Sequence, residues 1–297
     1  SDSNMSLETW DKMSETEKSL HPIRSKAQQK ANKVKSRINQ YFEKTLPFML
    51  RKTMHHPIAF VLHSKQSGYL AMTRLGGDRQ YVKIDSEEEL QEFLSKKTYD
   101  GESRFPGGKH NGIRTMLWTP TESGRNVKIG IVDIDNPANL PRADLYAVTR
   151  QVASVLETNG HPYIIMFTGN NFQVWFGPAI GEELGEMRYV AERIRSYLSP
   201  FGEFNRKDAI ENESFHFDES LVRPRRDGKS YQPTRMFFSL HYQIDERDPT
   251  KEYSGLAAVP VPVDDLAGSN QFEPAVHAHP EYVLDNFESL VLERLKF

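Results

Sequence analysis

One short run, residues 128–137 with the sequence KIGIVDIDNP, constrains the fold of this chain more than any other. Isoleucine and valine fill successive positions, so both faces of a strand here would be apolar, as is typical of a strand covered on both sides. The run ends in Asp133 and Asp135, and because side chains alternate along a strand, both carboxylates point to one face. Asn136 and Pro137 then end the strand. The run therefore predicts a central strand with two acids at its end.

The paired acids predict a metal site. Two ionised carboxylates about 4 Å apart repel by roughly 1 kcal/mol in water and by about 4 kcal/mol at an effective dielectric of 20. A partly buried pair therefore needs a cation or a shared proton. Carboxylate oxygens suit the hard ions Mg²⁺ and Mn²⁺. The alternative is a strand end whose aspartates only cap the following turn.

The composition excludes several classes of site. The chain has 297 residues, enough for one large domain or two small ones. It has no cysteine, which excludes disulfides, thiolate chemistry and cysteine zinc sites. No apolar run approaches the roughly 20 residues of a membrane span, and residues 1–10 show no signal-peptide pattern. We expect a soluble intracellular protein, cytoplasmic or nucleoid-associated, with no membrane partner.

The net charge of −3 conceals a basic segment near the N-terminus. Between residues 22 and 54 there are nine lysines and arginines but one acid. Residues 25–44 have a helical pattern with one apolar stripe, and a row of cations lies beside it: Lys26, Lys30, Lys33 and Arg37. Such a row is either a solvated helix face or a surface that contacts nucleic-acid phosphates.

The rest of the chain alternates between short strands and amphipathic helices. We expect helices at residues 48–54, 86–97, 142–158, 182–198 and 280–295, and strands at 58–63, 69–73, 113–118, 162–167 and 172–176. A glycine-rich loop, 101–112, lacks the spacing of a P-loop. This order around paired acids predicts an α+β fold, with helices on one side of a mostly antiparallel sheet.

A third carboxylate lies on another alternating segment, residues 214–218. There the phenylalanines would face the core while His216 and Asp218 share the opposite face. Asp218 is therefore available to join the acid pair.

A second alternating segment, residues 235–242, predicts a strand that carries phosphate-binding side chains. The alternation would place Arg235, Ser239 and His241 on one face. A basic turn with Arg225 and Arg226 precedes this strand, and its ordinary interpretation is a solvated loop.

The order of these motifs resembles the archaeo-eukaryotic primase (primase-polymerase) superfamily, and within it the polymerase domain of bacterial DNA ligase D. The resemblance covers residues 37–295. It implies an RRM-like antiparallel sheet with flanking helices as the catalytic core, plus an N-terminal α/β subregion. Residues 1–24 would then be a polar tail or short helix, and 25–297 a single domain, with 25–112 as its N-terminal part and 113–297 as the core with a C-terminal helix.

The resemblance also implies a role for each candidate residue. Asp133, Asp135 and Asp218 match the acids that hold two Mg²⁺ or Mn²⁺ ions. The remaining matches are to nucleotide-binding positions, namely Thr168, Gly169, Gln173, Arg235, Ser239 and His241. DNA contacts are expected from the basic residues named above, namely Lys26, Lys30, Lys33, Arg37, Arg225 and Arg226.

Gln173 departs from the family pattern. The second motif of the family normally ends in a histidine that contacts the triphosphate, whereas this chain is about one residue shorter there and has Gln173. Glutamine donates hydrogen bonds but carries no charge. Loss of a charge-assisted contact costs about 1 to 3 kcal/mol, or roughly ten- to a hundredfold in rate.

The resemblance implies a template-dependent nucleotidyltransferase that extends primers or fills gaps in DNA repair or end joining. Its partners would be primer-template, gapped or overhanging DNA, nucleoside triphosphates, and Ku and a ligase acting in trans. One alternative is a catalytically degenerate, DNA-binding subunit of a larger complex. Another is a metal-dependent phosphoesterase, since clustered acids also serve hydrolysis.

Overall fold

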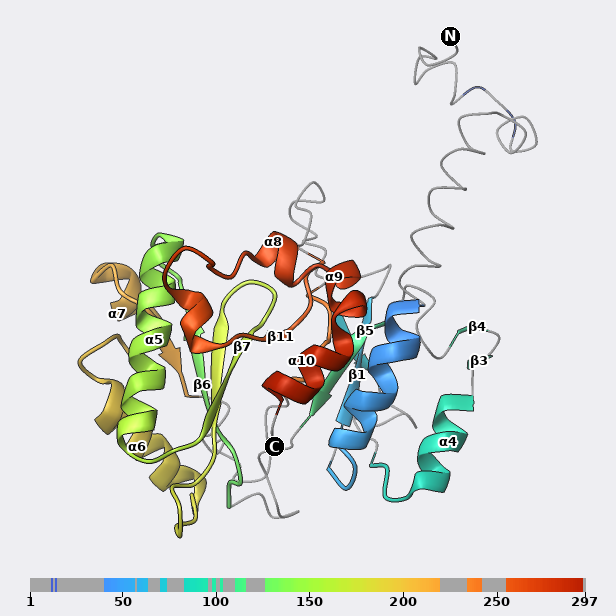
Figure 1. Ribbon diagram of the computed structural model, residues 1–297, viewed down its shortest axis with the longest axis horizontal. Coiled ribbons are helices and arrows are strands. Elements are labelled where there is room, and N and C mark those ends of the chain that lie inside the picture. Colours follow the sequence, from blue (N-terminus) through green and yellow to red (C-terminus); the bar gives the residue numbers. More distant parts are fainter. Residues whose placement is uncertain are drawn as a thin grey trace.

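A five-stranded antiparallel sheet forms one half of the molecule, drawn on the left of Figure 1. The computed structural model describes residues 12, 14, 40–56, 58–63, 70–73, 83–95, 98–99, 102–103, 110–115, 126–219, 234–241 and 255–295. The strands of this sheet are β6 (Gly130–Asp135), β7 (Tyr163–Phe167), β8 (Phe172–Phe176), β9 (His216–Asp218) and β11 (Val259–Pro260). Their order is β11-β7-β8-β6-β9, so β6 lies between β8 and β9, as expected for a strand that is apolar on both faces.

Two helices cover one face of this sheet: α5 (Arg142–Thr158) and α6 (Met187–Leu198). Tyr146 of α5 packs edge-on against Phe172, with ring centroids 5.5 Å apart. His161 connects α6 to the sheet, because its ring packs on Phe176 and its Nε2 lies 3.3 Å from the hydroxyl of Tyr197. The opposite face of the sheet carries Asp133 and Asp135 and is free of these two helices.

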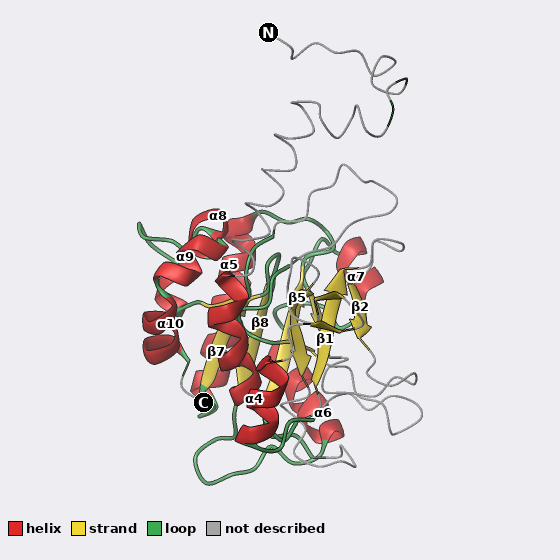
Figure 2. Ribbon diagram, turned by 90° about the vertical axis from the view of Figure 1, so that its right-hand side faces the viewer, coloured by secondary structure: helices red, strands yellow, loops and turns green. Residues whose placement is uncertain are grey.

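A second, four-stranded antiparallel sheet has the order β10-β5-β1-β2 (Figure 2). Its strands are β1 (Ile58–His63), β2 (Leu70–Thr73), β5 (His110–Thr115) and β10 (Thr234–Arg235). A helix over residues 40–52 and helix α4 (Glu87–Ser95) lie beside it, and a short hairpin follows, formed by β3 (Thr98–Tyr99) and β4 (Glu102–Ser103). The predicted α+β class is confirmed, including an α/β part that precedes the five-stranded sheet.

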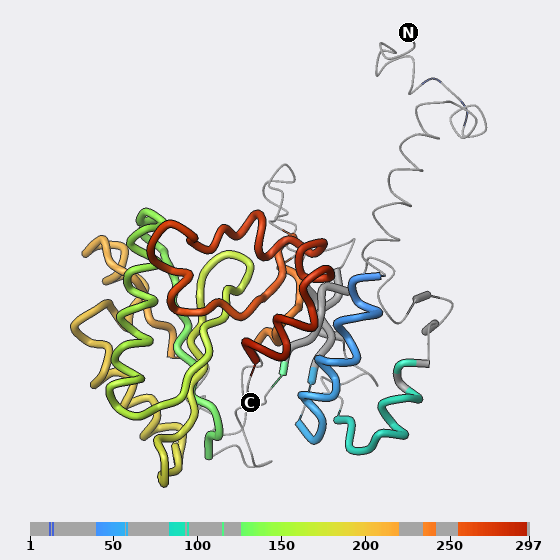
Figure 3. Tube along the Cα trace, viewed as in Figure 1, coloured from blue at the N-terminus to red at the C-terminus, as the bar shows by residue number. Residues whose placement is uncertain are grey.

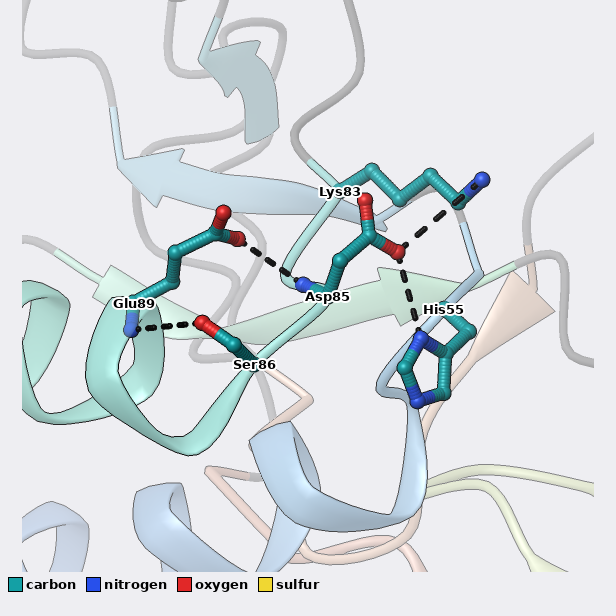
Figure 4. A network of polar contacts seen from close by, with 5 residues as sticks. All are labelled: His55, Lys83, Asp85, Ser86 and Glu89. Carbon is teal, nitrogen blue, oxygen red and sulfur yellow. Dashed lines mark hydrogen bonds and ion pairs between the residues drawn. The ribbon is translucent and has the colours of Figure 1, made fainter.

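A polar network fixes the start of α4 (Figure 4). The Ser86 hydroxyl accepts the backbone N–H of Glu89 at 3.1 Å, and the Glu89 carboxylate accepts the N–H of Asp85 at 2.9 Å. This reciprocal pattern is a variant of the capping box. His55, which has a φ of 69°, places its Nδ1 3.2 Å from Asp85 Oδ1, and Lys83 lies 4.0 Å from the same oxygen. The network joins the end of the 40–52 helix to α4.

The C-terminal segment runs from the five-stranded sheet to the 40–52 helix (Figure 3). It contains a 3-10 helix, η1 (Val263–Leu266), and the helices α8 (Pro274–His277), α9 (Pro280–Asp285) and α10 (Phe287–Arg294). At one end, Tyr146 of α5 donates its hydroxyl to the carbonyl of Phe272 at 2.6 Å. At the other end, Phe287 packs against Phe48 of the 40–52 helix, with centroids 5.8 Å apart. The segment therefore ties the two halves together.

A tight turn after β10 is held by both terminal parts of the chain. Phe238 has a φ of 72°, a left-handed conformation that is rare for a bulky residue. The Tyr41 hydroxyl donates to the Phe238 carbonyl at 2.5 Å, and burial raises the pKa of Tyr41 well above its usual range, so this donor keeps its proton. The Phe238 ring packs between Phe48 and Phe287. These contacts keep the turn in its strained conformation.

Most of the predicted elements are confirmed, but several boundaries are wrong. Helix 142–158 and strand 172–176 have the predicted bounds. The predicted helix 182–198 begins only at Met187, because Gly185 has a φ of 80° and its carbonyl accepts the N–H of Val127. The single closing helix is two helices that meet at Asn286.

Two further corrections concern regions with proline or a strained turn. The 40–52 helix passes through Pro47 without a break, because one of its sides is buried through Tyr41, Phe42, Leu46, Met49 and Leu50. The predicted strand 235–242 ends at Arg235, since the Phe238 turn follows at once. No helix within the described ranges is long and apolar enough to cross a membrane.

We predict that Tyr41→Phe lowers the free energy of unfolding by about 1–2 kcal/mol, because it removes a buried hydrogen bond to a strained turn. Urea denaturation followed by circular dichroism would measure the change. Tyr189→Phe is the control, since Tyr189 is 49% exposed and its hydroxyl accepts a hydrogen bond from the neighbouring Arg188. An equal loss in the two variants would contradict the role of Tyr41.

Candidate functional site

Three aspartates from two strands meet on the face of the five-stranded sheet opposite α5 and α6. The antiparallel register sets Asp133 of β6 directly opposite Asp218 of β9, and Asp135 opposite His216. One carboxylate oxygen from each of Asp133, Asp135 and Asp218 lies within 4.8 Å of those of the other two. Three converging carboxylates are a donor set that fits a hard divalent cation.

The position of β9 depends on contacts outside the acid cluster. Glu219, which follows Asp218 and is 4% exposed, accepts two 2.9 Å hydrogen bonds from the Arg195 side chain of α6. Gly202 lies so close to β9 that an added Cβ would come within 2.7 Å of the Phe217 ring. These contacts align β9 with β6 and so bring Asp218 to the pair.

The acids of β6 resist ionisation. Burial raises the pKa of Asp133 well above its usual range, and the charges of Asp135 and Asp218 raise it further. A hydrogen bond from Gln173 and the charge of Arg235 act in the opposite direction. Burial, followed by the charge of Asp218, also raises the pKa of Asp135. A bound cation would relieve both effects, which is the electrostatic signature of a metal site.

Four of the six predicted nucleotide-binding residues lie together at the turn between β7 and β8. The Thr168 hydroxyl accepts the N–H of Asn171 at 3.1 Å, and an Nη1 hydrogen of Arg235 bonds to the Thr168 carbonyl. Gly169 has a φ of 101°, and a Cβ there would come within 2.2 Å of the His241 side chain. Thr168, Gly169, Arg235 and His241 therefore form one cluster beside Asp133, whose pKa the Arg235 charge lowers.

Gln173 lies inside the protein, next to Asp133 in the strand register. It is 6% exposed, and its amide accepts from Trp175 Nε1 at 3.0 Å and donates to Thr234 Oγ1 at 3.1 Å. Trp175 in turn packs on Phe237 at 5.2 Å. Gln173 thus joins the five-stranded sheet to β10 of the other sheet.

Ser239 does not share a face with Arg235 and His241. The predicted alternation fails because the backbone turns at Phe238. Ser239 is 2% exposed, and its Oγ lies 3.6 Å from the sulfur of Met49.

Two polar residues at the site were missed as candidates. His216 lies opposite Asp135 in the register, with its Nδ1 3.5 Å from Asp135 Oδ2. Arg206, an exposed residue at the start of helix α7 (Arg206–Glu211), is close enough for its charge to lower the pKa of Asp135. The alternation of residues 214–218 placed His216 on the face of Asp218, but only the register with β6 relates it to Asp135. No sequence signal marked Arg206.

The predicted DNA-binding cations, namely Lys26, Lys30, Lys33, Arg37, Arg225 and Arg226, lie outside the described residues. In the described part of the basic segment, Arg51 pairs with Glu87 of α4 at 2.6 Å. Lys44 and Lys52 lie over the rings of Phe287 and Phe48.

A cavity of about 650 Å³ lies near the start of β6, at the other end of the sheet from the acids. Its described lining is mainly apolar, with Ile129, Ile164 and Trp175 among its walls. An apolar cavity of this size could hold a small apolar ligand. It lacks the converging carboxylates that make the three aspartates a candidate cation site.

Comparison with known proteins identifies a structural neighbour but no family. Neither the protein families nor the curated proteins contain a match to this sequence. Among solved structures, the chain is similar to the polymerase domain of Mycobacterium tuberculosis ligase D, solved in complex with DNA, with a TM-score of 0.51 and 13% sequence identity. The match covers 88% of this chain and 93% of that chain. At this identity the likeness concerns the fold, and it agrees with the primase-polymerase-like core expected from the motifs.

We predict that Asp133→Asn raises the Tm of the metal-free protein near pH 7. Folding raises the pKa of Asp133. At any pH between its pKa in the unfolded chain and its pKa in the folded chain, the folded protein binds more protons than the unfolded one. The free energy of unfolding therefore falls as pH rises through this interval. If the substitution removes about 1 kcal/mol of the free-energy cost of burying this carboxylate, the Tm should rise by roughly 2–4 °C in a chain of this size. The same variant should lose the Tm increase that Mg²⁺ or Mn²⁺ gives the wild type, as scanning calorimetry can measure.

Asp144→Asn is the matched control, because Asp144 is exposed in the first turn of α5, where its charge favours the helix. It should leave the metal effect unchanged and should not raise the Tm. A metal-induced increase that persists in Asp133→Asn would contradict the assignment.

Proposed function

We propose that this protein is a metal-dependent nucleotidyltransferase that extends a DNA primer or fills a gap opposite a template. The observation that carries the proposal is the convergence of Asp133, Asp135 and Asp218 from two strands, beside the single cluster of Thr168, Gly169, Arg235 and His241. The fold shared with a polymerase domain supports it.

Asp133, Asp135 and Asp218 would hold Mg²⁺ or Mn²⁺, two ions in the full site. Bound there, the ions supply activation of the attacking hydroxyl and neutralisation of charge on the leaving pyrophosphate. The protein side chains would fix the acids through the β6–β9 register and the Arg195–Glu219 pair. They would also exclude water from the base of the site, where Ile131 and Trp175 are buried.

The Arg235 guanidinium would contact the triphosphate. It bonds to the Thr168 carbonyl through Nη1, which fixes its orientation beside the acids. A guanidinium held in this way presents planar donors suited to phosphate oxygens. His241 and the Thr168–Gly169 turn would line the same pocket. Ser239 has no direct role in this proposal, because it is buried against Met49.

DNA would bind across this face and along the basic residues Lys26, Lys30, Lys33, Arg37, Arg225 and Arg226. Phosphate contacts of this kind make affinity fall steeply with salt. In DNA repair or end joining, Ku and a ligase would act in trans.

A second candidate is a catalytically degenerate member of the fold that binds DNA as a subunit of a larger complex. The position of Gln173 favours it. Its amide is bonded to Trp175 and Thr234 and is 6% exposed, so it would contribute little to triphosphate binding. An active enzyme, by contrast, would have to rely on Arg235 and His241 for its nucleotide contacts.

We predict metal-dependent incorporation of nucleotides on labelled gapped or overhanging DNA, tested with Mg²⁺ and Mn²⁺ and with ribo- and deoxyribonucleotides. Asp133→Ala and Asp135→Ala should abolish it, because each removes a metal ligand. Asp144→Ala, on the helix side of the sheet, should retain it.

The wild type and the same aspartate variants also distinguish the nucleotidyltransferase from the catalytically degenerate DNA-binding subunit. Salt-sensitive DNA binding that survives the aspartate substitutions, with no incorporation by the wild type, would select the degenerate subunit. Shortening of the labelled strand without extension would select a phosphoesterase. No binding to DNA at low salt would contradict both DNA-based proposals.

We predict that Arg235→Ala lowers kcat/KM for the nucleotide by about ten- to a hundredfold, because a charged hydrogen bond to phosphate is worth roughly 1.5–3 kcal/mol. Arg235→Lys should recover part of the loss, since it keeps the charge but not the planar fork. Arg188→Ala is the control, because Arg188 stacks on the exposed Tyr189 away from the acids. Steady-state kinetics at saturating DNA would measure the effect, and equal activity of the Arg235 and Arg188 variants would refute the contact.

A further inference from the structure

The His216 side chain lies at the site without a well-formed hydrogen bond at Nδ1. The side chain is 12% exposed and its Nδ1 is buried. Among the described residues, Nδ1 makes no hydrogen bond of ordinary geometry, and it forms a long contact with Asp135. A buried polar atom of this kind is uncommon in native proteins, and a bound ion is one physical reason for it.

The His216 Nδ1 faces a carboxylate oxygen of the acid cluster. Asp135 Oδ2 lies 3.5 Å away, which is longer than a well-formed hydrogen bond between an imidazole and a carboxylate. The same separation suits two ligands of one ion. Two atoms each about 2.1 Å from a metal and 3.5 Å apart subtend roughly 110° at that metal, within the range of ordinary coordination.

The strand pairing keeps the two groups in this position. His216 and Asp135 are cross-strand partners in the β6–β9 ladder, and Asp135 is also one of the three clustered acids. On the far side of β9, residue 203 forms a parallel bridge with His216, so the strand is held on both edges. The Asp135 side chain is 27% exposed, which gives an ion access from solvent.

We propose that His216 Nδ1 is an additional metal ligand, which binds an ion shared with Asp135. This inference rests on the metal site of the proposed function, but not on polymerisation. Imidazole is a softer donor than carboxylate and suits later first-row ions better than Mg²⁺. The site should therefore prefer Mn²⁺ over Mg²⁺ more strongly than a site of carboxylates alone.

Pulsed electron paramagnetic resonance of protein loaded with a substoichiometric amount of Mn²⁺ would test this ligand directly. The wild type should show coupling of the ion to an imidazole nitrogen. His216→Asn and His216→Phe should lose that coupling while remaining folded, since asparagine keeps a polar group and phenylalanine fills the space of the ring. Isothermal titration should show Mn²⁺ affinity falling about tenfold or more in both variants, and Mg²⁺ affinity falling by less than about threefold.

His55→Asn is the matched control. His55 and Asp85 form another histidine–aspartate pair, 3.2 Å apart, but both side chains are more than half exposed and lie at α4 (Figure 4). This variant should retain the nitrogen coupling and both metal affinities.

Three results would overturn the proposal. Mn²⁺ bound without nitrogen coupling would mean that the carboxylates act alone, and the metal site of the proposed function would stand. Coupling that persists in both His216 variants would assign the nitrogen to another residue. Absence of Mn²⁺ binding in the wild type would remove both the ligand and the metal site, whereas missing primer extension with intact nitrogen coupling would affect only the proposed reaction.

Discussion

The pairing of β6 with β9 is the constraint on which the site depends. Backbone hydrogen bonds fix Asp133 opposite Asp218 and Asp135 opposite His216, so the ladder brings the three carboxylates close to one another. Their repulsion is therefore imposed by the fold. The Arg195–Glu219 pair and the close approach of Gly202 to Phe217 hold the short strand β9 in place against that repulsion. A three-residue strand alone would be too short to do so.

The apolar surroundings of the acids explain how the fold tolerates them. Ile131 and Trp175 are buried on the same face as Asp133, and Trp175 packs on Phe237 from the segment that follows β10. These apolar side chains cover one end of the sheet face that carries Asp133, and the carboxylates lie at the other end of that face. Burial of the apolar end stabilises the sheet, while burial of the acid end raises the pKa of Asp133 and disfavours its charge. Such local instability is expected where a protein keeps a site for a cation.

Sequence patterns predicted the parts of the fold that depend on local periodicity. The acid strand, helix 142–158 and the hairpins follow from alternation and amphipathic spacing, and all are present. The strand predicted beyond Arg235 failed because the conformation of Phe238 depends on Tyr41, which is 197 residues away in the chain. The pairing of His216 with Asp135 was also out of reach, because an alternating pattern gives the face of a side chain but not the strand register. The parts of the site that could not be predicted from sequence periodicity are therefore those whose conformation or pairing depends on long-range contacts.

The strands on either side of β6, namely β8 and β9, differ in the hydrogen bonding of the polar side chains that they place next to the acids. On the β8 side, Gln173 is bonded to Trp175 and Thr234, so its hydrogen-bonding groups are used within the protein. On the β9 side, His216 Nδ1 is buried and makes no well-formed hydrogen bond among the described residues, because its contact with Asp135 is 3.5 Å long. A polar group that is satisfied by the protein serves packing, whereas one that is left unsatisfied beside carboxylates gains most from an ion. We infer that the β8 side of β6 supports Asp133 structurally, whereas the proposed additional metal ligand lies on the β9 side.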